Sequence, residues 1–444
     1  MTDTIHDFLG VGFGPANLAV AVAIDNRALQ LSGRYLEQRE TFAWQPDMLL
    51  RGSDIQHHPL RDLITPVNPR SEYGFVNYLH QSGRFFEYLN VGSAFPLRLE
   101  FANYVKWVSQ QFSGNVHFGS EVVSIDVGND LGNGKLVQID CADGSMQLAR
   151  NVVIGPGRAW NVPEMFEPLI GGRVFHLMEY LPKIKALKAP ERIAVIGGSQ
   201  SAVEILLDLD TRFPDAIIDG ITRKFGFTLK DTSPFSGEVY FPDFTDYYYN
   251  APVESRLALS AELRGTNYAS ADRDVLDQLY MRRYESGLEG FRDHLTIRRS
   301  KTIRNACLVE GGVQLEIQDL HDNHRNVETY DAVVLATGFL DFGTGGQRRP
   351  NHPLLTELEP HFEFDSRLGF DVARDYALIG DDDSPGVYLN GLCEHSHGFG
   401  DAGSFSLISL RADMIARSLA ERLSRQRATS TKSGRGRPAE TILA

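Results

Sequence analysis

The sequence is poor in cysteine, has no long apolar run and carries no excess of positive charge. Its cysteines, Cys141, Cys307 and Cys393, lie far apart and form no CxxC pair, so neither a disulfide framework nor a zinc site is expected. The net charge of -14 argues against a nucleic-acid-binding surface, because phosphates are held by clustered Lys and Arg. Since a run of roughly eighteen apolar residues and a basic leader segment are both missing, we expect a cytoplasmic protein with no metal site, no membrane span and no nucleic-acid partner.

The clearest pattern lies at residues 7–18, where DFLGVGFGPANL is typical of a buried strand, a glycine turn and a helix start. Gly12 would let the backbone approach a pyrophosphate, and the helix that follows offers unpaired N–H groups. Glu37 ends the next predicted strand, where its carboxylate can accept the ribose hydroxyls. A glycine turn in another βαβ unit is the alternative, because Pro15 stands where a third glycine is usual. The residues assigned to this first dinucleotide site are Gly10, Gly12, Gly14, Pro15, Asn17 and Glu37.

A second pattern of the same kind lies at residues 192–205, RIAVIGGSQSAVEI. Two such patterns in one chain are far less expected by chance than one, so a second dinucleotide is predicted. The next predicted strand, 216–222, ends in two basic residues, which suits a ribose 2′-phosphate and favours NADPH over NADH. Ser199 replaces the second glycine, and its Cβ would narrow the approach to the pyrophosphate. The residues assigned here are Gly197, Gly198, Ser199, Gln200, Ser201, Arg223 and Lys224.

With 444 residues the chain is too long for one ordinary core. We predict an α/β fold with two Rossmann-like dinucleotide-binding domains and a smaller substrate-binding region. The first domain would take residues 1–165 and return at 326–423, the second would take 166–325 with inserted substrate-site loops, and 424–444, with few apolar residues, would form a disordered tail. Within the first domain we expect a helix at 101–112, a small antiparallel insertion between 116 and 149, and an amphipathic helix at 404–423.

An irregular, polar segment at 42–73 carries Trp44, Gln56, His57, His58 and Arg61. Such a long irregular segment inside a compact domain is usually functional. A surface loop anchored by its Trp is the alternative. For the two histidines, plain hydrogen bonding is the simpler interpretation, since no third metal ligand lies at suitable spacing.

Several further short motifs accompany the two glycine turns, and together they form a set whose order along the chain is typical of one enzyme family. The set comprises GxGFGPANL at 10–18, Trp44 with Met48-Leu49-Leu50, Gln56, GGSQSA at 197–202, Asn267-Tyr268, ATGF at 336–339 and EHxHG at 394–398. From about residue 7 to 420 the chain resembles the flavin-dependent N-hydroxylating monooxygenases, in particular the L-ornithine N5-monooxygenases and, less closely, the L-lysine N6-hydroxylases of siderophore biosynthesis. The resemblance implies FAD on the first pattern and NADPH on the second, with Trp44, Gln56, Thr337, Gly338 and His397 also at the cofactors.

The resemblance also implies the reaction. NADPH would reduce FAD, O2 would give a C4a-hydroperoxyflavin, and the neutral terminal amine of a small substrate would take the distal oxygen. Because the cofactor carries the hard step, no protein nucleophile is required. Gln56, Asn267 and Ser406 match catalytic pocket residues, and the implied substrate-binding residues are Gln56, His57, His58, Arg61, Gly237, Asn267 and Ser406. Members of the family often assemble, so a homo-oligomer, a dimer or tetramer, is expected.

Two positions depart from the ornithine hydroxylases. Arg61 stands where they have a lysine that grips the amino-acid carboxylate, and Gly237 stands where they have an asparagine. An arginine can clamp a carboxylate through two hydrogen bonds, whereas a glycine removes one polar contact. We expect an L-ornithine-like substrate, and a diamine, histamine or arginine are the alternatives. A flavin-dependent disulfide or quinone reductase is a second hypothesis, but such an enzyme requires a CxxC pair, which the sequence lacks. A nucleotide-sensing scaffold without turnover is a third hypothesis.

Overall fold

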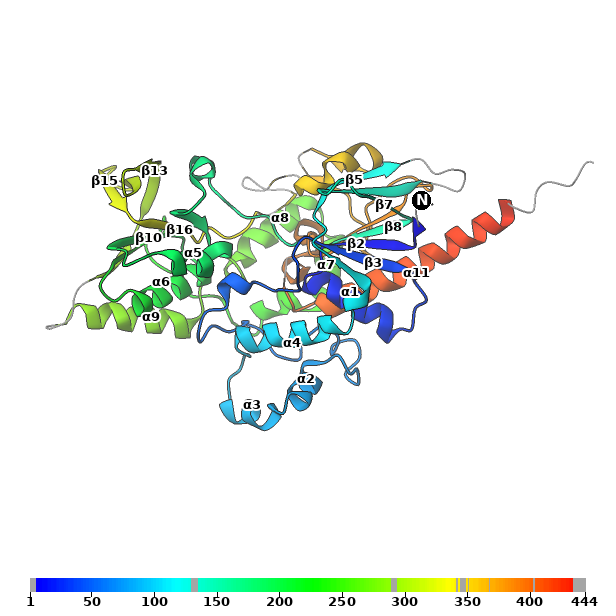
Figure 1. The fold of residues 1–444 in the computed structure, drawn as a ribbon, viewed down its shortest axis with the longest axis horizontal. Helices are drawn as coiled ribbons and strands as arrows, with labels where there is room; N and C mark the ends of the chain where they lie inside the picture. Colours follow the sequence, from blue (N-terminus) through cyan, green and yellow to red (C-terminus); the bar gives the residue numbers. More distant parts are fainter. Residues whose placement is uncertain are drawn as a thin grey trace, which may run out of the picture.

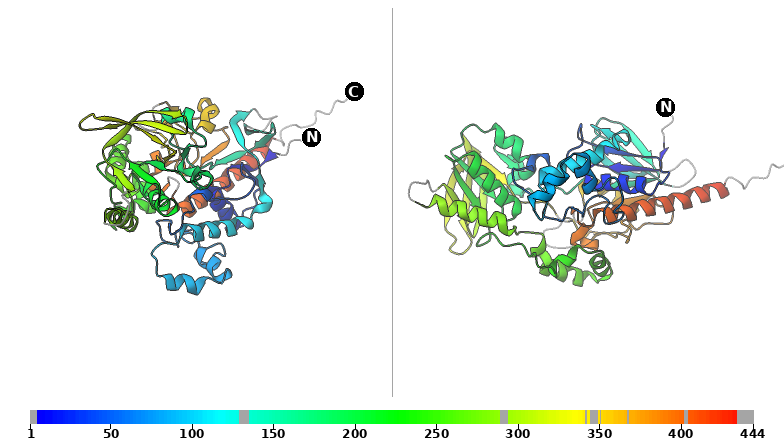
Figure 2. Two further views of the ribbon diagram at one scale, coloured as in Figure 1. Left: turned by 60° about the vertical axis from the view of Figure 1, so that its left-hand side comes forward. Right: turned by 90° about the horizontal axis from the view of Figure 1, so that it is seen from below.

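The computed structural model describes residues 5–128, 135–288, 294–340, 342–343, 349, 351–366, 368–401 and 404–433. Two α/β units lie side by side along the long axis of the molecule (Figures 1 and 2). Each is built on a five-stranded sheet, and this confirms the predicted α/β class. Among the helices of these residues, none has the length and apolar composition that crossing a bilayer requires.

The first unit contains the sheet order β19-β8-β2-β3-β4, with every neighbouring pair parallel. Its strands are β2 (Phe8–Val11), β3 (Gly33–Glu37), β4 (Val116–Phe118), β8 (Asn151–Ile154) and β19 (Gly386–Leu389). β2, β8 and β19 are buried at every position, as expected for parallel strands covered on both faces. α1 (Pro15–Asn26) follows the glycine turn after β2, and it packs against α11 (Ile408–Ser433).

The predicted antiparallel insertion is present in this unit from Val122 onward, whereas β4, the first strand expected in it, pairs in parallel with β3 of the five-stranded sheet. The insertion is a four-stranded sheet of β1 (Ile5–His6), β7 (Met146–Ala149), β6 (Leu136–Cys141) and β5 (Val122–Gly128), in that order. β5, β6 and β7 pair antiparallel, and β1 adds in parallel to β7. The helix expected at 101–112 is α4 (Arg98–Gln110), which lies above α2 (Phe75–Gln81) and α3 (Phe85–Val91) in Figure 1.

The second unit has the parallel order β12-β11-β10-β16-β9. These strands are β9 (Val174–His176), β10 (Arg192–Ile196), β11 (Ile217–Ile221), β12 (Leu295–Arg298) and β16 (Ala332–Leu335), with the helices α5 (Tyr180–Ala186), α6 (Gln200–Arg212) and α9 (Arg273–Ser286). A three-stranded antiparallel sheet follows β12, made of β13 (Lys301–Val309), β14 (Gly312–Asp319) and β15 (Arg325–Tyr330).

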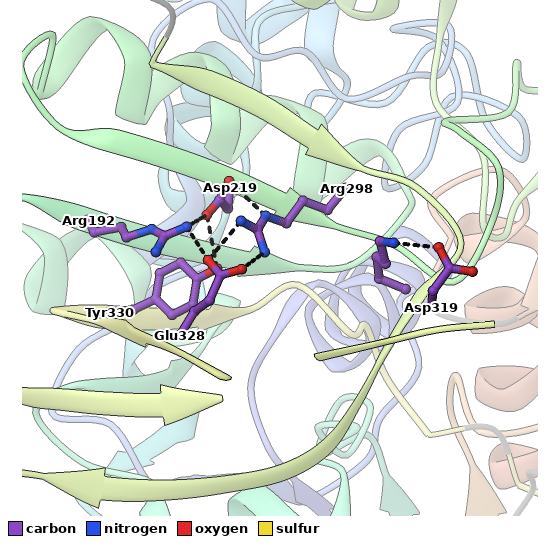
Figure 3. Close-up of polar contacts among 7 residues, drawn as sticks. Arg192, Asp219, Arg298, Asp319, Glu328 and Tyr330 are labelled. Carbon is purple, nitrogen blue, oxygen red and sulfur yellow. Dashed lines mark hydrogen bonds and ion pairs between the residues drawn. The ribbon is translucent and has the colours of Figure 1, made fainter. Parts of the chain in front are cut away.

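A buried ionic cluster joins these two sheets of the second unit (Figure 3). Asp219 of β11 is only 1% exposed, and it accepts hydrogen bonds from Arg192 Nη2 at 2.7 Å and from Tyr330 Oη at 2.9 Å. Arg298 Nε lies 3.1 Å from its other oxygen, and both arginines also pair with Glu328. Each charged side chain of the cluster has a partner of opposite sign. We therefore interpret the cluster as a structural contact between the two sheets and not as a candidate functional site.

The remaining elements connect or border the two units. Between β11 and β12 come η5 (Ser236–Tyr240), α7 (Pro242–Asn250), α8 (Val253–Glu262) and η6 (Leu263–Thr266), and near the C-terminus come η7 (Pro353–His361), β17 (Phe364–Asp365), β18 (Gly369–Phe370), α10 (Glu394–His397) and η8 (Phe399–Asp401). Short 3-10 turns η1 (Pro46–Met48), η2 (Ser113–Asn115), η3 (Glu164–Leu169) and η4 (Leu177–Glu179) lie along the chain.

Two expectations about the boundaries of the domains and of the C-terminal tail are also wrong. β16 pairs with β10 in parallel, so residues 326–335 belong to the second unit and not to the return of the first. A short buried apolar strand fits either sheet equally well, and only its partner decides. The tail is also misassigned, because α11 continues to Ser433 and its last turns project beyond the first unit (Figures 1 and 2). Leu, Gln, Arg and Ala favour this helix, and Arg427 pairs with Asp7 at 2.9 Å. Residues 434–444 lie outside the described residues.

Candidate active site

A cavity of about 1350 Å³ is lined by residues of both units. Its walls come from the irregular segment 44–61, the turn 197–201, the stretch 264–270, the turn 336–340 and residues 404–406. Pockets for one small ligand usually measure about 300–1,000 Å³. The volume is therefore large enough for a dinucleotide portion and a small substrate together.

Most of the predicted site residues meet in this cavity although they are far apart in the sequence. Those that line it are Trp44, Gln56, His57, His58, Arg61, Gly197, Gly198, Ser199, Gln200, Ser201, Arg223, Lys224, Asn267, Thr337, Gly338 and Ser406. The residues of the first glycine turn, together with Gly237 and His397, are not part of its lining.

The first glycine turn has the backbone that a pyrophosphate site needs. Gly12 has a φ of +80°, and a Cβ there would lie 2.6 Å from the carbonyl oxygen of Gly155. Gly14 is the N-cap of α1, no side chain caps this helix, and a Cβ on Gly14 would meet nothing within 4 Å. The start of α1 therefore opens onto free space, where its N–H groups and its dipole favour an anion.

Two polar side chains fix the shape of this turn. Glu37, at the end of β3, accepts hydrogen bonds from the backbone N–H of Phe13 at 2.7 Å and of Arg39 at 3.0 Å. Since each carboxylate oxygen has a second lone pair, Glu37 can still accept ribose hydroxyls. Asn17 differs from its assignment, because it is completely buried and donates to the carbonyl oxygens of Val11 and Gly12. Its side chain holds the turn from inside and does not face a nucleotide.

The second glycine turn forms part of the cavity wall. A Cβ on Gly197 would lie 2.4 Å from the carbonyl oxygen of Ala336, and one on Gly198 would lie 2.8 Å from Thr222 Oγ1, so both positions need glycine. Ser199 is the N-cap of α6, with an extended backbone and no side-chain capping bond. The turn therefore accommodates the Cβ of Ser199, and the N–H of Gln200, the first residue of α6, donates to the carbonyl oxygen of Ser270 at 2.9 Å.

Positive charge gathers beside this turn. Arg223 and Lys224 follow β11 and line the cavity together with Arg264. Lys224 Nζ donates to the carbonyl oxygen of Ala269 at 2.7 Å, and burial together with the charge of Arg264 lowers the pKa of Lys224. A group of cations that includes a guanidinium suits a phosphate monoester such as the 2′-phosphate of NADPH.

An aromatic wall formed by Trp44, His57 and Phe405 borders the cavity near Arg61. The completely buried ring of Phe101 packs behind this wall, with ring centroids 5.3 Å apart for His57 and Phe101, and those of Trp44 and Phe405 lie 5.1 Å apart. His57 Nδ1–H donates to the carbonyl oxygen of His58 at 3.2 Å, and burial lowers the pKa of His57 to about 4. The imidazole is therefore neutral at neutral pH, and the wall is largely apolar.

Arg61 brings a positive charge to the same region. Its Nη1 donates to Ser406 Oγ at 3.4 Å, and burial lowers its pKa. Within the described part of the chain, no carboxylate pairs with Arg61. The neighbouring Asp62 is fully buried and accepts the backbone N–H groups of Ile64 at 2.9 Å and Phe75 at 2.7 Å, which fixes the loop that carries Arg61. A half-buried guanidinium without a protein carboxylate fits an anionic group on a ligand.

Two assigned residues lie away from the cavity wall. His397 is completely buried and stacks on Tyr376 with ring centroids 4.2 Å apart, and burial lowers its pKa to about 3. It is a packing residue, which corrects its assignment to the cofactor. Gly237 lies on η5, where a Cβ would meet nothing within 4 Å, and Tyr240 of the same turn lines the cavity in its place.

Sequence reasoning missed several cavity residues. Arg158, Lys230 and Arg264 all line the cavity, and the guanidinium carbons of Arg158 and Arg264 lie 5.3 Å and 5.0 Å from the centroid of the Tyr268 ring. Arg158 follows the glycine turn after β8, and that position could have identified it. Single basic residues in loops such as Lys230 and Arg264 carry no periodic signal. Over the described residues, no group of His, Cys, Asp or Glu side chains is arranged to hold a metal ion.

Comparison with known proteins gives consistent matches. The sequence profile of the family described as L-lysine 6-monooxygenase/L-ornithine 5-monooxygenase matches residues 4–341. The chain is 35% identical to the L-ornithine N(5)-monooxygenase of Pseudomonas aeruginosa over 95% of both chains, and 35% identical to that of Burkholderia cepacia over 89% of this chain and 90% of the relative. The solved structure of the Kutzneria sp. 744 ornithine N-hydroxylase KtzI, with reduced FAD, NADP+ and L-ornithine, has a TM-score of 0.87 at 30% identity and covers 95% of this chain and 100% of its own.

Proposed function

Because the chain belongs to the L-lysine 6-monooxygenase/L-ornithine 5-monooxygenase family, we propose that it is a flavin-dependent monooxygenase that uses FAD, NADPH and O2 to hydroxylate the terminal amine of L-ornithine. The observation that carries the substrate proposal is the position of Arg61. It lies in the same cavity as the second glycine turn and has no carboxylate partner among the described residues.

The first glycine turn fits FAD. The open helix start at Gly14 suits the pyrophosphate, and Glu37 suits the ribose hydroxyls. When bound and reduced, FAD supplies the activation of O2, a step that amino-acid side chains do not provide. The protein's part is to hold the flavin, to keep water away and to position the amine.

The second glycine turn fits NADPH. The start of α6 lines the cavity without a side-chain cap. The backbone N–H of Gln200 donates to the carbonyl oxygen of Ser270 at 2.9 Å, so the attraction for a pyrophosphate comes from the positive end of the helix dipole and not from this N–H group. Arg223 and Lys224 supply the charge that a 2′-phosphate needs. Thr337 and Gly338 line the same cavity. The nicotinamide ring of NADPH, which carries the hydride, could therefore reach the region between the two units.

The substrate end of the cavity combines Arg61 with the aromatic wall. Arg61 would bind the carboxylate of the amino acid, and Asn267 and Ser406 on the same lining would hydrogen-bond the rest of the substrate. The terminal amine must be neutral to react, and its pKa in water is near that of a lysine side chain, about 10.4. Contact with the apolar side chains of Trp44 and Phe405, which line the cavity, would remove water from the amine and favour the neutral form.

We make three further proposals, which concern the pathway, the location in the cell and the oligomeric state. Hydroxylated ornithine would serve siderophore biosynthesis, the role typical of the family. We propose a cytoplasmic location, where Cys141, Cys307 and Cys393 would remain the free thiols that the structure has. We also propose a homo-oligomer of two or four chains, which sedimentation velocity of the purified protein would test.

Comparison of two substrates tests the proposed role of Arg61. Arg61→Met keeps an unbranched apolar chain in place of the aliphatic part of the arginine but removes the guanidinium and its charge. We expect this change to raise the KM for L-ornithine by about 10- to 100-fold, the range for a hydrogen bond to a charged group, and to leave the KM for putrescine, which has no carboxylate, nearly unchanged. Arg51→Met, at an exposed arginine of the same segment, is the matched control. Equal effects of Arg61→Met on both substrates would contradict the carboxylate clamp.

A further inference from the structure

Gln56 reaches the cavity in a strained conformation. Its backbone has a φ of +58°, in the left-handed region that non-glycine residues rarely adopt. Such strain persists only where the surroundings hold it, and it concentrates at functional sites. Its backbone N–H donates to Asp54 Oδ1 at 3.0 Å, and its side chain lines the cavity.

The side chain of Gln56 is bound by a residue of the other unit. Gln56 Nε2 donates a hydrogen bond to Asp272 Oδ2. Asp272 is the residue before α9, its side chain is 15% exposed, and it does not cap its own helix. The carboxylate is thus directed at two residues that line the cavity, since its Oδ2 accepts from Gln56 and its Oδ1 lies 4.0 Å from Lys230 Nζ, and not at the helix that it precedes.

This contact fixes the orientation of the amide. A carboxylate can only accept hydrogen bonds, whereas an amide has a donor side and an acceptor side. The NH2 group of Gln56 must therefore face Asp272, and the carbonyl oxygen, Oε1, must point another way. We propose that Asp272 is a positioning residue that orients Gln56 so that its Oε1 accepts an N–H group of the bound ligand. The inference rests on the proposed function, because the ligand N–H would belong to the substrate amine or to the carboxamide of the nicotinamide.

Asp272 is itself held by the second glycine turn. Its backbone N–H donates to Gln200 Oε1 at 2.8 Å, and Gln200 Nε2 donates to Glu204 Oε1 at 3.0 Å. Gln200 is the first residue of α6 and lines the cavity. A continuous set of hydrogen bonds thus runs from the turn assigned to NADPH, through Asp272, to the amide of Gln56.

The first experiment replaces the carboxylate by an amide of nearly the same shape. An asparagine can donate as well as accept, so Asp272→Asn would free Gln56 to flip. Asp274→Asn, at an exposed acid two residues along the same helix, makes the same change in charge and is the matched control. The measurements are the KM and kcat for L-ornithine, the dissociation constants of L-ornithine and NADP+ by calorimetry, and the melting temperature.

We expect Asp272→Asn to weaken binding of one ligand about tenfold, as for the loss of one hydrogen bond, with a melting temperature close to that of Asp274→Asn. A loss for L-ornithine identifies the substrate amine as the donor, and a loss for NADP+ identifies the nicotinamide carboxamide. Affinities for both ligands equal to those of Asp274→Asn would overturn the inference. If Asp272→Asn does not fold, Asp272→Ser removes the carboxylate and keeps a residue preferred before a helix, and the same results are expected.

A double-mutant cycle shows whether Asp272 acts through Gln56. In the Gln56→Ala background, Asp272→Asn should have no further effect on the affected ligand, because the amide that it orients is gone. The full tenfold effect in that background would overturn the positioning role. Formation of hydroxylamine by the unmodified protein tests the proposed function separately, since ligand affinities decide the inference whether or not product forms.

Discussion

A buried ion pair between the two units allows the sharpest stability prediction. Arg98 of α4 and Glu204 of α6 have side chains that are only 11% and 4% exposed. Arg98 donates to both oxygens of Glu204 at 2.9 Å, to the carbonyl oxygen of Met48 at 3.0 Å and to that of Asp54 at 3.1 Å. The guanidinium is therefore fully engaged, and Glu204 supplies its only negative partner among these contacts.

Glu204→Leu would leave the charge of Arg98 buried without a counter-ion. Breaking a buried pair in this way costs about 3–5 kcal/mol, which lowers the midpoint of thermal unfolding by about 3–5 °C if a chain of this length unfolds as one unit. The measurement is calorimetry of the holoprotein. The matched control is Glu316→Leu, whose partner Arg325 is at a similar distance, 2.8 Å, but is 58% exposed, and which should cost less than about 1 kcal/mol.

A second variant separates lost charge pairing from lost packing. Arg98→Met together with Glu204→Leu removes both charges, and it should recover much of the stability that Glu204→Leu loses, because no unpaired charge stays buried. Glu204→Leu with the same midpoint as Glu316→Leu would refute the reasoning. A double variant no more stable than Glu204→Leu would show that packing, and not the stranded charge, determines the cost.

Three further predictions concern the cofactor sites and pH. Gly12→Ala should yield protein without flavin absorbance, because its Cβ would lie 2.6 Å from the carbonyl oxygen of Gly155, whereas Gly144→Ala, with a similar φ of +82° but open space, should retain FAD. Arg223→Ala should raise the KM for NADPH about 10- to 100-fold and hardly change that for NADH, and an equal change for both would contradict the 2′-phosphate role. Burial raises the pKa of Asp54 to about 6, so its ionised form is disfavoured in the folded protein. Asp54→Asn should therefore stabilise the protein by about 1 kcal/mol at pH 7.5, a value reduced for solvent screening, and by nothing near pH 4, as melting temperatures at the two values would show.

Local patterns predicted the two nucleotide folds well. The requirement for glycine at Gly12 and Gly197 comes from a turn and a close approach within one βαβ unit, and such local geometry leaves a mark in the sequence. The contacts of Arg61 with Ser406 and of Gln56 with Asp272 join residues hundreds of positions apart. The resemblance to a known family placed Arg61, Gln56 and Ser406 in one pocket, but no local pattern identified Asp272.

The errors share a physical cause. Asn17 and His397 belong to patterns associated with cofactors, yet tertiary packing buries both side chains completely. Asn17 accepts a hydrogen bond from Asn390 at 2.9 Å, a partner that the N-terminal pattern cannot reveal. The strand 332–335 joins the second unit and not the first, and a short apolar strand alone does not specify which sheet it joins.

The central claim is that the protein converts a terminal amine to a hydroxylamine, and product formation tests it most directly. Purified protein with FAD would be mixed with NADPH, O2 and L-ornithine, and with lysine, arginine, putrescine, cadaverine or histamine in parallel. Mass spectrometry would follow the product, because NADPH oxidation can also end in hydrogen peroxide. We predict that L-ornithine gains one oxygen atom at its terminal nitrogen and is preferred over the other amines. NADPH oxidation without hydroxylamine from any of these amines would contradict the account.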